Sequence, residues 1–280
     1  MQSIRQIYKK LLLILSLPII LQEYFSPKTG AEYKIGFLKK MILILKMARN
    51  NKKIPTASDV TEHLTMATKI LSIPKTLEGC VVECGTYYGA SASNLSLVCT
   101  LTGRKLEVFD SFAGLPKPSK HDAKHKILDL SQIHSYTEGA WSATLTEVKD
   151  NITRFGEIKI CNFHVGFFKK TLPMFNKKCV FVFLDVDLVD SVKTCLKYLW
   201  PKLGKNCYLF THEAHHMGIA SLFFDKIFWQ KNLNSTPPGL VGAGSGLGLI
   251  PETGAFKSSL GYTVKNPNVK KFKIKQQTGK

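Results

Sequence analysis

The stretch VVECGTYYGASASNLSLVCTLTGRKLEVFDSFAGLP occupies residues 81–116 and decides the fold. An apolar run ends at Glu83, and a turn with Gly85 and Gly89 follows it. A segment compatible with a helix comes next, and a second apolar run ends at Asp110. This order predicts a strand, a glycine-bearing turn, a helix and a strand. Such units build a nucleotide-shaped cleft at the carboxyl ends of their strands, and the glycines let the backbone approach a ligand closely.

Apolar strands and helical segments alternate through the rest of the chain. Strands are predicted at 158–163, 179–188 and 206–211, and helices at 142–154, 190–200 and 218–230. A helix near 59–72, capped by Ser58 or Thr56, precedes the first strand. This alternation predicts an α/β fold with a mostly parallel sheet covered by helices on both faces. The aromatic residues at 223–229 are predicted to belong to the core.

The chain is predicted to have three parts. Residues 1–55 form a basic helical N-terminal extension, 56–265 form the α/β domain, and 266–280 form a basic flexible tail. The run LLLILSLPIIL at 11–21 is short and interrupted by Pro18. It is open to interpretation as a membrane anchor, a signal segment or a packed helix. We favour helices packed on the domain or across the interface of a homo-oligomer, with contact to an anionic membrane surface as the alternative.

Composition restricts the partners and the compartment. The chain has 39 Lys and Arg residues against 20 Asp and Glu, a net charge of +19, which favours an anionic partner. No RNA- or DNA-binding motif is present, so nucleic acid is the less favoured partner. Seven cysteines without a CxxC pair predict reduced, buried thiols rather than disulfides or a zinc site. We therefore expect a cytoplasmic protein, with membrane association through the N-terminal segment left open.

Polar side chains stand at the ends of four successive predicted strands. They are Glu83, Asp110, Asp185 with Asp187, and His212 with Glu213. In a parallel sheet these ends face one shared crevice. The first turn has neither the GxGxxG dinucleotide fingerprint nor the lysine of a P-loop, and its acid argues against a pyrophosphate. A cationic cofactor without phosphates, such as S-adenosylmethionine, fits better, with Asp110 accepting hydrogen bonds from the ribose hydroxyls.

Four segments resemble the macrocin O-methyltransferase (TylF-like) family of class I S-adenosylmethionine-dependent methyltransferases. They are ECGTYYGAS at 83–91, FDSFAGLP at 109–116, HVGFFKKTLP at 164–173 and LDVDLVDSVKTCLKYLWPKL at 184–203. The resemblance covers roughly residues 60–230 and implies a Rossmann-like fold and O-methyl transfer to a hydroxyl of a small acceptor, a sugar or glycan. The predicted cofactor-binding residues are Glu83, Gly85, Thr86, Tyr87, Ser91, Asp110, Ser111, Trp141, Ser142, Gly166, Phe167 and Asp185.

The resemblance also implies a divalent metal, usually magnesium, beside the cofactor. By position, Asp185, His212 and Glu213 match its ligands, and Asp187 matches the general base that takes the acceptor's proton. This chain departs from the family pattern, because His212 replaces an aspartate and Val189 replaces a tyrosine. Imidazole suits manganese, iron or zinc better than magnesium, so the metal's identity and its presence both stay open.

Two loops, at 113–140 and 242–248, are predicted to lie near the acceptor or to form lids. Residues 113–140 are predicted to form a long loop or lid, where His121, Asp122 and His125 are either solvated or in contact with the acceptor. The glycine-rich 242–248 is interpreted as an acceptor-side or lid segment. The alternative function is a non-catalytic binding protein on the same scaffold, which contacts an anionic membrane or nucleic acid through its basic surface.

Overall fold

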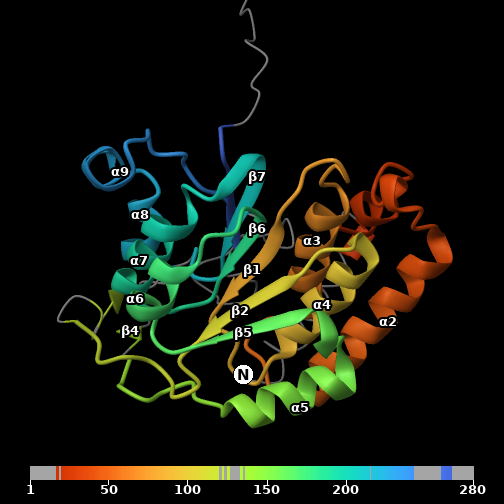
Figure 1. The fold of residues 1–280 in the computed structure, drawn as a ribbon, viewed down its shortest axis with the longest axis horizontal. Helices are drawn as coiled ribbons and strands as arrows, with labels where there is room; N and C mark the ends of the chain where they lie inside the picture. Colours follow the sequence, from red (N-terminus) through yellow and green to blue (C-terminus); the bar gives the residue numbers. More distant parts are fainter. Residues whose placement is uncertain are drawn as a thin grey trace, which may run out of the picture.

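Figure 1 shows the fold in a computed structural model of the chain. The structure describes residues 17–18, 20–119, 122, 125–126, 133–134, 136–214, 216–242 and 260–266. A central sheet lies between two groups of helices (Figure 1). The α/β architecture predicted from the alternation of apolar strands and helices is therefore confirmed.

The described residues place seven strands in one sheet, in the order β5-β2-β1-β6-β7-β9-β8. The strands are β1 (Cys80–Cys84), β2 (Leu106–Asp110), β5 (Cys161–Val165), β6 (Cys179–Leu184), β7 (Leu203–Thr211), β8 (Val241–Gly242) and β9 (Gly261–Val264). The first five in this order pair in parallel, whereas β9 and β8 pair antiparallel at one side. The carboxyl ends of the parallel strands therefore meet at one edge. A separate antiparallel pair joins β3 (His125–Lys126) to β4 (Ile133–His134).

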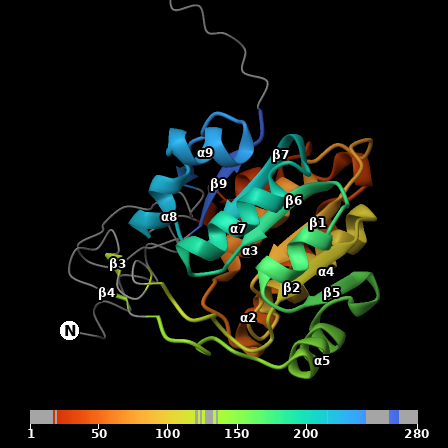
Figure 2. The same ribbon diagram turned by 60° about the vertical axis from the view of Figure 1, so that its left-hand side comes forward.

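Helices cover both faces of the sheet (Figures 1 and 2). One group consists of α2 (Phe37–Lys53), α3 (Val60–Leu71), α4 (Ala90–Thr102) and α5 (Leu145–Phe155). The other consists of α6 (Phe168–Thr171), α7 (Val189–Leu199), α8 (Met217–Leu222) and α9 (Lys226–Leu233). Short 3₁₀ helices lie at Ala31–Tyr33, Ile158–Ile160 and Leu172–Met174.

The core is built around the two central strands. Every residue of β1 and of β6 is buried, as expected for parallel strands with helices on both sides. All seven cysteines are free and six of them are buried, which agrees with the prediction of reduced thiols. The aromatic segment of 223–229 is only partly core, because Phe223 and Trp229 are buried whereas Phe224 is exposed.

The single helix predicted at 218–230 is two helices, α8 and α9, because Asp225 caps a new helix by accepting from the Phe228 N–H. The strand predicted at 179–188 ends at Leu184.

Two further local predictions need correction. The N-cap of α3 is Asp59, not Ser58 or Thr56, because the Asp59 carboxylate accepts from the backbone N–H groups of Thr61 and Glu62. The Glu62 carboxylate accepts in return from the Asp59 N–H, which completes a capping box. The strand expected at 158–163 begins later, at Cys161, because a 3₁₀ turn occupies Ile158–Ile160.

Hydrogen bonds of side-chain amides hold α2 against the sheet domain. Asn50 of α2 donates from Nδ2 to Asn94 Oδ1 of α4 (2.8 Å) and to the Phe155 carbonyl (2.9 Å). Asn94 in turn donates to Asn51 Oδ1 at 3.0 Å. These bonds fix the position of α2 against α4, because breaking them would leave buried polar groups without partners. None of the helices in the described part of the chain is long and apolar enough to span a membrane.

Candidate active site

The turn after β1 lies directly against the end of β6. Gly85 has a φ of +82°, and a Cβ on it would lie 1.8 Å from the Asp185 carbonyl oxygen. The Gly85 N–H donates to the Phe109 carbonyl of β2, and the Asp185 N–H donates to the Cys84 carbonyl, both at 2.9 Å. Only glycine allows this approach, which brings three strand ends together.

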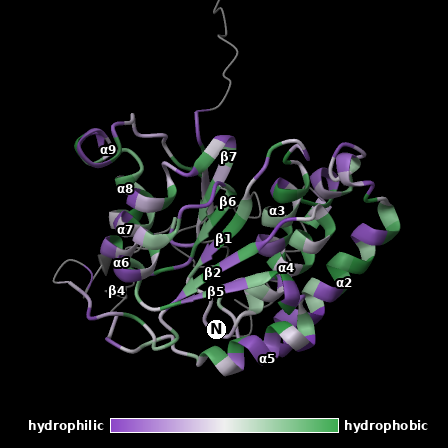
Figure 3. Cartoon of the chain, in the orientation of Figure 1, coloured by the Kyte–Doolittle hydropathy of each residue, from purple (hydrophilic) through white to green (hydrophobic). Residues whose placement is uncertain are grey.

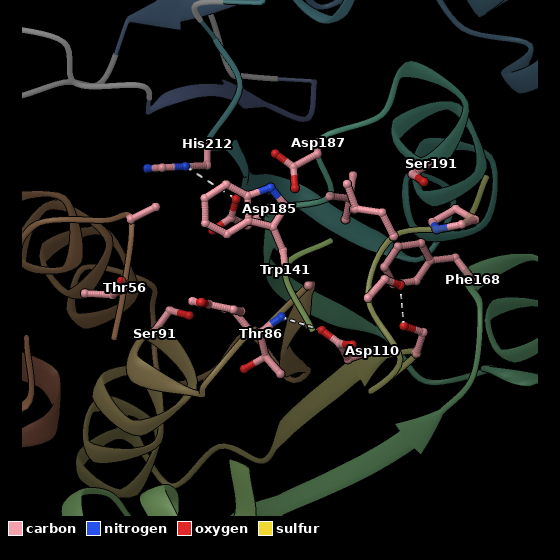
Figure 4. Close-up of a pocket in the computed structure, with 18 of the residues that line it drawn as sticks. Thr56, Thr86, Ser91, Asp110, Trp141, Phe168, Asp185, Asp187, Ser191 and His212 are labelled. Atoms are coloured by element: carbon pink, nitrogen blue, oxygen red, sulfur yellow. Dashed lines mark hydrogen bonds and ion pairs between the residues drawn. The ribbon is translucent and has the colours of Figure 1, made fainter. Parts of the chain in front are cut away.

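A cleft of about 880 Å³, partly open to solvent, lies at these strand ends. Figure 4 shows Asp185, Asp187 and His212 along one side of it, and Thr86, Ser91 and Asp110 along the opposite side. Of the predicted site residues, the cleft brings together Gly85, Thr86, Tyr87, Ser91, Asp110, Ser111, Trp141, Phe167, Asp185, Asp187 and His212. The shared crevice inferred from the strand ends is therefore present.

Four predicted site residues do not line the cleft. Glu83 and Glu213 are buried behind it. Ser142 is exposed beside Trp141, and Gly166 donates its N–H to the Asp110 carbonyl at 2.9 Å. These residues support the cleft or lie next to it rather than face it.

The Asp110 carboxylate accepts a hydrogen bond from the turn between β1 and α4. Its Oδ2 accepts from the Thr86 N–H and its Oδ1 from the Phe112 N–H, both at 2.7 Å. Burial raises the pKa of Asp110, and these backbone donors oppose the rise. The Tyr87 N–H is a third backbone donor to this carboxylate. A carboxylate has about four acceptor positions, so about one remains for a ligand in the cleft.

Of the two acids near the β1 turn, Glu83 and Asp110, Glu83 has the more strongly raised pKa. Its side chain is fully buried, and burial raises its pKa from 4.5 to about 8, although the hydroxyls of Ser91 and Thr86 lower it. The Thr86 hydroxyl lies 3.3 Å from Oε2, whereas Oε1 has no hydrogen-bond partner among the described residues. A buried ionised acceptor without a donor is costly, so the carboxyl of Glu83 holds a proton in the ligand-free protein at neutral pH.

A third carboxyl group with a raised pKa, that of Asp187, follows β6. Asp187 has a φ of +59°, and its half-buried carboxyl lies close to Asp185 and Glu213. Burial and those two neighbours raise the pKa of Asp187 to about 8, while a hydrogen bond from Tyr136 lowers it. The same environment raises the pKa of the Tyr136 hydroxyl. Tyr136 was missed in the sequence, because nothing in the loop pattern of 113–140 distinguishes it.

His212 lies between two carboxylates. Its Nδ1 is 3.4 Å from Asp185 Oδ1, and its Nε2 is 3.2 Å from Glu62 Oε2. Although burial lowers the pKa of this imidazole, the two acids raise it well above its ordinary value. The Ser58 hydroxyl also faces Nε2, at 3.3 Å. Glu62 was missed as a site residue; the D-x-x-E spacing of 59–62 is the signal that marks its position.

The predicted metal site does not fit these residues. Glu213 Oε1 accepts from the N–H groups of Val186 and Asp187 at 2.7 and 3.0 Å, and Oε2 accepts from the Thr211 hydroxyl. The Nδ1 of His212 faces Asp185 and its Nε2 faces Glu62, so neither nitrogen is directed to a point that Asp185 and Glu213 also face. No cluster of three or more His, Cys, Asp or Glu side chains able to hold a metal occurs in the described ranges.

The predicted lid contributes to the site in a different way from that expected. Asp122 is buried, and its Oδ1 accepts from the Val189 N–H at 2.8 Å, at the start of α7. It is therefore not solvated. It lies outside this cleft, which the loop contacts through Gly114, Leu115 and Pro116, but it lines a neighbouring pocket that shares Pro116 and Phe167 with the cleft. His121, the His125 side chain and residues 243–248 lie outside what the structure describes.

Residues 61–231 match the family of macrocin O-methyltransferase (TylF). This chain belongs to that family. It is therefore an O-methyltransferase, and the resemblance drawn from the four motifs is confirmed. None of the curated proteins compared with the chain matches it.

Two solved structures share the fold. The O-methyltransferase NovP has 15% identity and a TM-score of 0.51, with 92% of this chain and 99% of NovP covered. The calicheamicin methyltransferase CalS11 has 15% identity and a TM-score of 0.53, with 81% of this chain and 92% of CalS11 covered. At these identities the likeness shows a class I methyltransferase fold and nothing about the acceptor.

The buried Glu83 predicts a pH-dependent stability. Because its pKa is raised from 4.5 to about 8, the folded protein holds a proton that the unfolded chain releases, so stability falls as pH rises across this window. In Glu83→Gln the slope should become shallower by up to about 1.4 kcal/mol per pH unit. Urea unfolding of the ligand-free protein across the window measures this. An unchanged slope in Glu83→Gln contradicts the assignment, and Glu138→Gln provides a matched control on an exposed residue.

Proposed function

We propose that this O-methyltransferase transfers the methyl group of S-adenosylmethionine to a hydroxyl of a small acceptor. The sugar or glycan implied by the family resemblance is the acceptor class we favour. One observation carries the proposal: a single cleft connects the acids behind and beside the β1 turn with Asp187 after β6. The cofactor supplies a methyl group on a sulfonium, and the chain supplies positioning and a proton acceptor.

Three features support the cofactor half. Glu83 lies behind the cleft, and its side-chain hydrogen-bond partners Thr86 and Ser91 line the cleft where we place the amino-acid end of the cofactor. Asp110 accepts from three backbone N–H groups and has about one acceptor position left for a ribose hydroxyl. At the mouth of the cleft, the ring of Trp141 is 53% exposed and lies 5.6 Å from the ring of Tyr87, in an edge-to-face arrangement. An exposed ring held in this way suits stacking against a purine.

Asp187 is the group that we propose as the general base. A hydroxyl is a weak nucleophile until a base accepts its proton, and a base works best when its pKa is close to the working pH. The pKa of Asp187, raised to about 8, meets this condition. Tyr136 hydrogen-bonds to the Asp187 carboxylate and orients it, as a positioning residue beside the base.

Calorimetry with S-adenosylhomocysteine tests the cofactor half. The protein should bind it, and Asp110→Asn should weaken binding by about tenfold to a hundredfold, because a hydrogen bond to a charged group contributes about 1.5–3 kcal/mol. Asp150→Asn on the exposed side of α5 is the matched control and should bind normally. Absence of binding by the unaltered protein would overturn the proposal and favour a non-catalytic role.

The base assignment predicts how the rate depends on pH. Asp187 is protonated below a pH of about 8 and ionised above it, so kcat/KM should rise with pH and level off beyond that value. Asp187→Asn should lower kcat by about 10²–10⁴-fold. Initial rates across pH, with an acceptor that the enzyme methylates, measure both. A rate that is unchanged by Asp187→Asn would remove this residue from the mechanism.

We further propose that α2 contacts an anionic membrane surface. Four large apolar residues of α2 are exposed: Phe37, Leu38, Ile42 and Leu45, at 66%, 73%, 50% and 63%. Figure 3 shows that α2 carries both hydrophobic and hydrophilic residues along its length. Five exposed basic residues accompany them on the same helix: Lys39, Lys46, Arg49, Lys52 and Lys53. Apolar side chains flanked by cations are the pattern of helices that lie in a lipid headgroup region, and the net charge of +19 agrees with it.

Sedimentation with vesicles tests the membrane contact. The protein should pellet with phosphatidylcholine vesicles that contain phosphatidylserine and much less with phosphatidylcholine alone. Leu38→Glu should abolish this, whereas Met174→Glu, which alters an apolar side chain exposed by 83% outside α2, should not. If Leu38→Glu instead dissociates a dimer in the ultracentrifuge, a second copy of the chain covers this face.

A further inference from the structure

The acids that a metal would need are engaged by other groups. Glu213 is held by two backbone N–H groups and one hydroxyl. Removing the carboxylate from them would leave the N–H groups of Val186 and Asp187 without their acceptor, in the turn that carries the proposed base. Glu213 therefore supports that turn, and three of its about four acceptor positions are already used.

His212 also has no nitrogen left for a metal. An imidazole coordinates a metal through a nitrogen lone pair, but each nitrogen here faces a carboxylate oxygen, at 3.4 and 3.2 Å. A hydrogen bond to a carboxylate requires an N–H, so both contacts are made together only by the doubly protonated, cationic ring. The ring is only 9% exposed, so its two carboxylate partners, rather than water, compensate its charge.

The second partner of His212 comes from outside the strand ends. Glu62 belongs to the first turn of α3, where its Oε2 also accepts from the Asp59 N–H at 3.0 Å. The capping box therefore fixes the Glu62 carboxylate, and Glu62 and Asp185 hold the imidazole from opposite sides. The neighbouring His63 is fully buried with a pKa lowered to about 4, so it adds no competing cation.

We propose that the imidazole of His212, held between Glu62 and Asp185, takes the place of the divalent metal that the family resemblance implies, so that this chain works without one. The inference rests on the proposed function. His212 acts as a positioning residue: it orients Asp185 at the wall of the cleft and places a positive charge near Asp187. The acceptor is then held by side chains of this chain rather than by chelation.

Mn²⁺ is the probe, because its binding is read by electron paramagnetic resonance without any acceptor. The full-length protein, saturated with S-adenosylhomocysteine, should bind no stoichiometric Mn²⁺. His212→Asp replaces the cation by a third carboxylate beside Glu62 and Asp185, an oxygen-rich set that suits hard divalent ions. We expect it to bind Mn²⁺ at least tenfold more tightly than His212→Asn, which has the same shape without the charge.

Two results would overturn the inference. One is stoichiometric Mn²⁺ binding by the unaltered protein that is lost in Asp185→Asn. The other is equal Mn²⁺ affinity in His212→Asp and His212→Asn, with circular dichroism showing both folded. If His212→Asp does not fold, the Mn²⁺ titration of the unaltered protein decides alone. Binding of S-adenosylhomocysteine, measured in the same samples, reports separately on the proposed function, because the metal can bind or fail to bind in a protein that holds the cofactor.

Discussion

The contact between Gly85 and the backbone of Asp185 determines the geometry of the site. With a Cβ at residue 85, the end of β1 could not lie against the end of β6, because that atom would overlap the Asp185 carbonyl. The hydrogen bonds from Gly85 to Phe109 and from Asp185 to Cys84 depend on the same approach. They connect the ends of β2, β1 and β6, and therefore the positions of Asp110, Glu83 and Asp187.

Because these strand ends meet, several carboxyl groups lie close together at positions with limited access to water. Burial raises the pKa of Glu83 and of Asp187 to about 8, and that of Glu213 to about 7. Such acids oppose folding when ionised, so the ligand-free site holds unfavourable electrostatic energy. His212 offsets part of it from the side of β7. The arrangement is understandable if a cationic ligand and a proton transfer belong to the working enzyme, since both relieve the repulsion among these carboxyls.

The sequence predicted the features that depend on local pattern. The β1–α4–β2 unit, the fully apolar β6 and the acids at the strand ends followed from periodicity and from the glycine turn. The side-chain partners did not follow, because they depend on distance in space rather than along the chain. Glu62 and His212 are 150 residues apart and meet because the first turn of α3 reaches the residue that follows β7. Glu213 matched a ligand by position, yet the turn around Asp187 uses its carboxylate. Tyr136 lies in a loop without a recognisable pattern.

Residues that contact Glu62 and His212 precede the part of the chain that matches the family. The family match starts at residue 61, but Asp59, which fixes Glu62, and Ser58, which faces His212, come before that point. Pro55, Thr56 and Ala57 are part of the wall of the cleft. The link between the N-terminal helices and the sheet is thus also part of the candidate site. A fragment that begins at residue 61 would retain the strands that carry the motifs, but it would lose the part of the cleft wall formed by Pro55, Thr56 and Ala57.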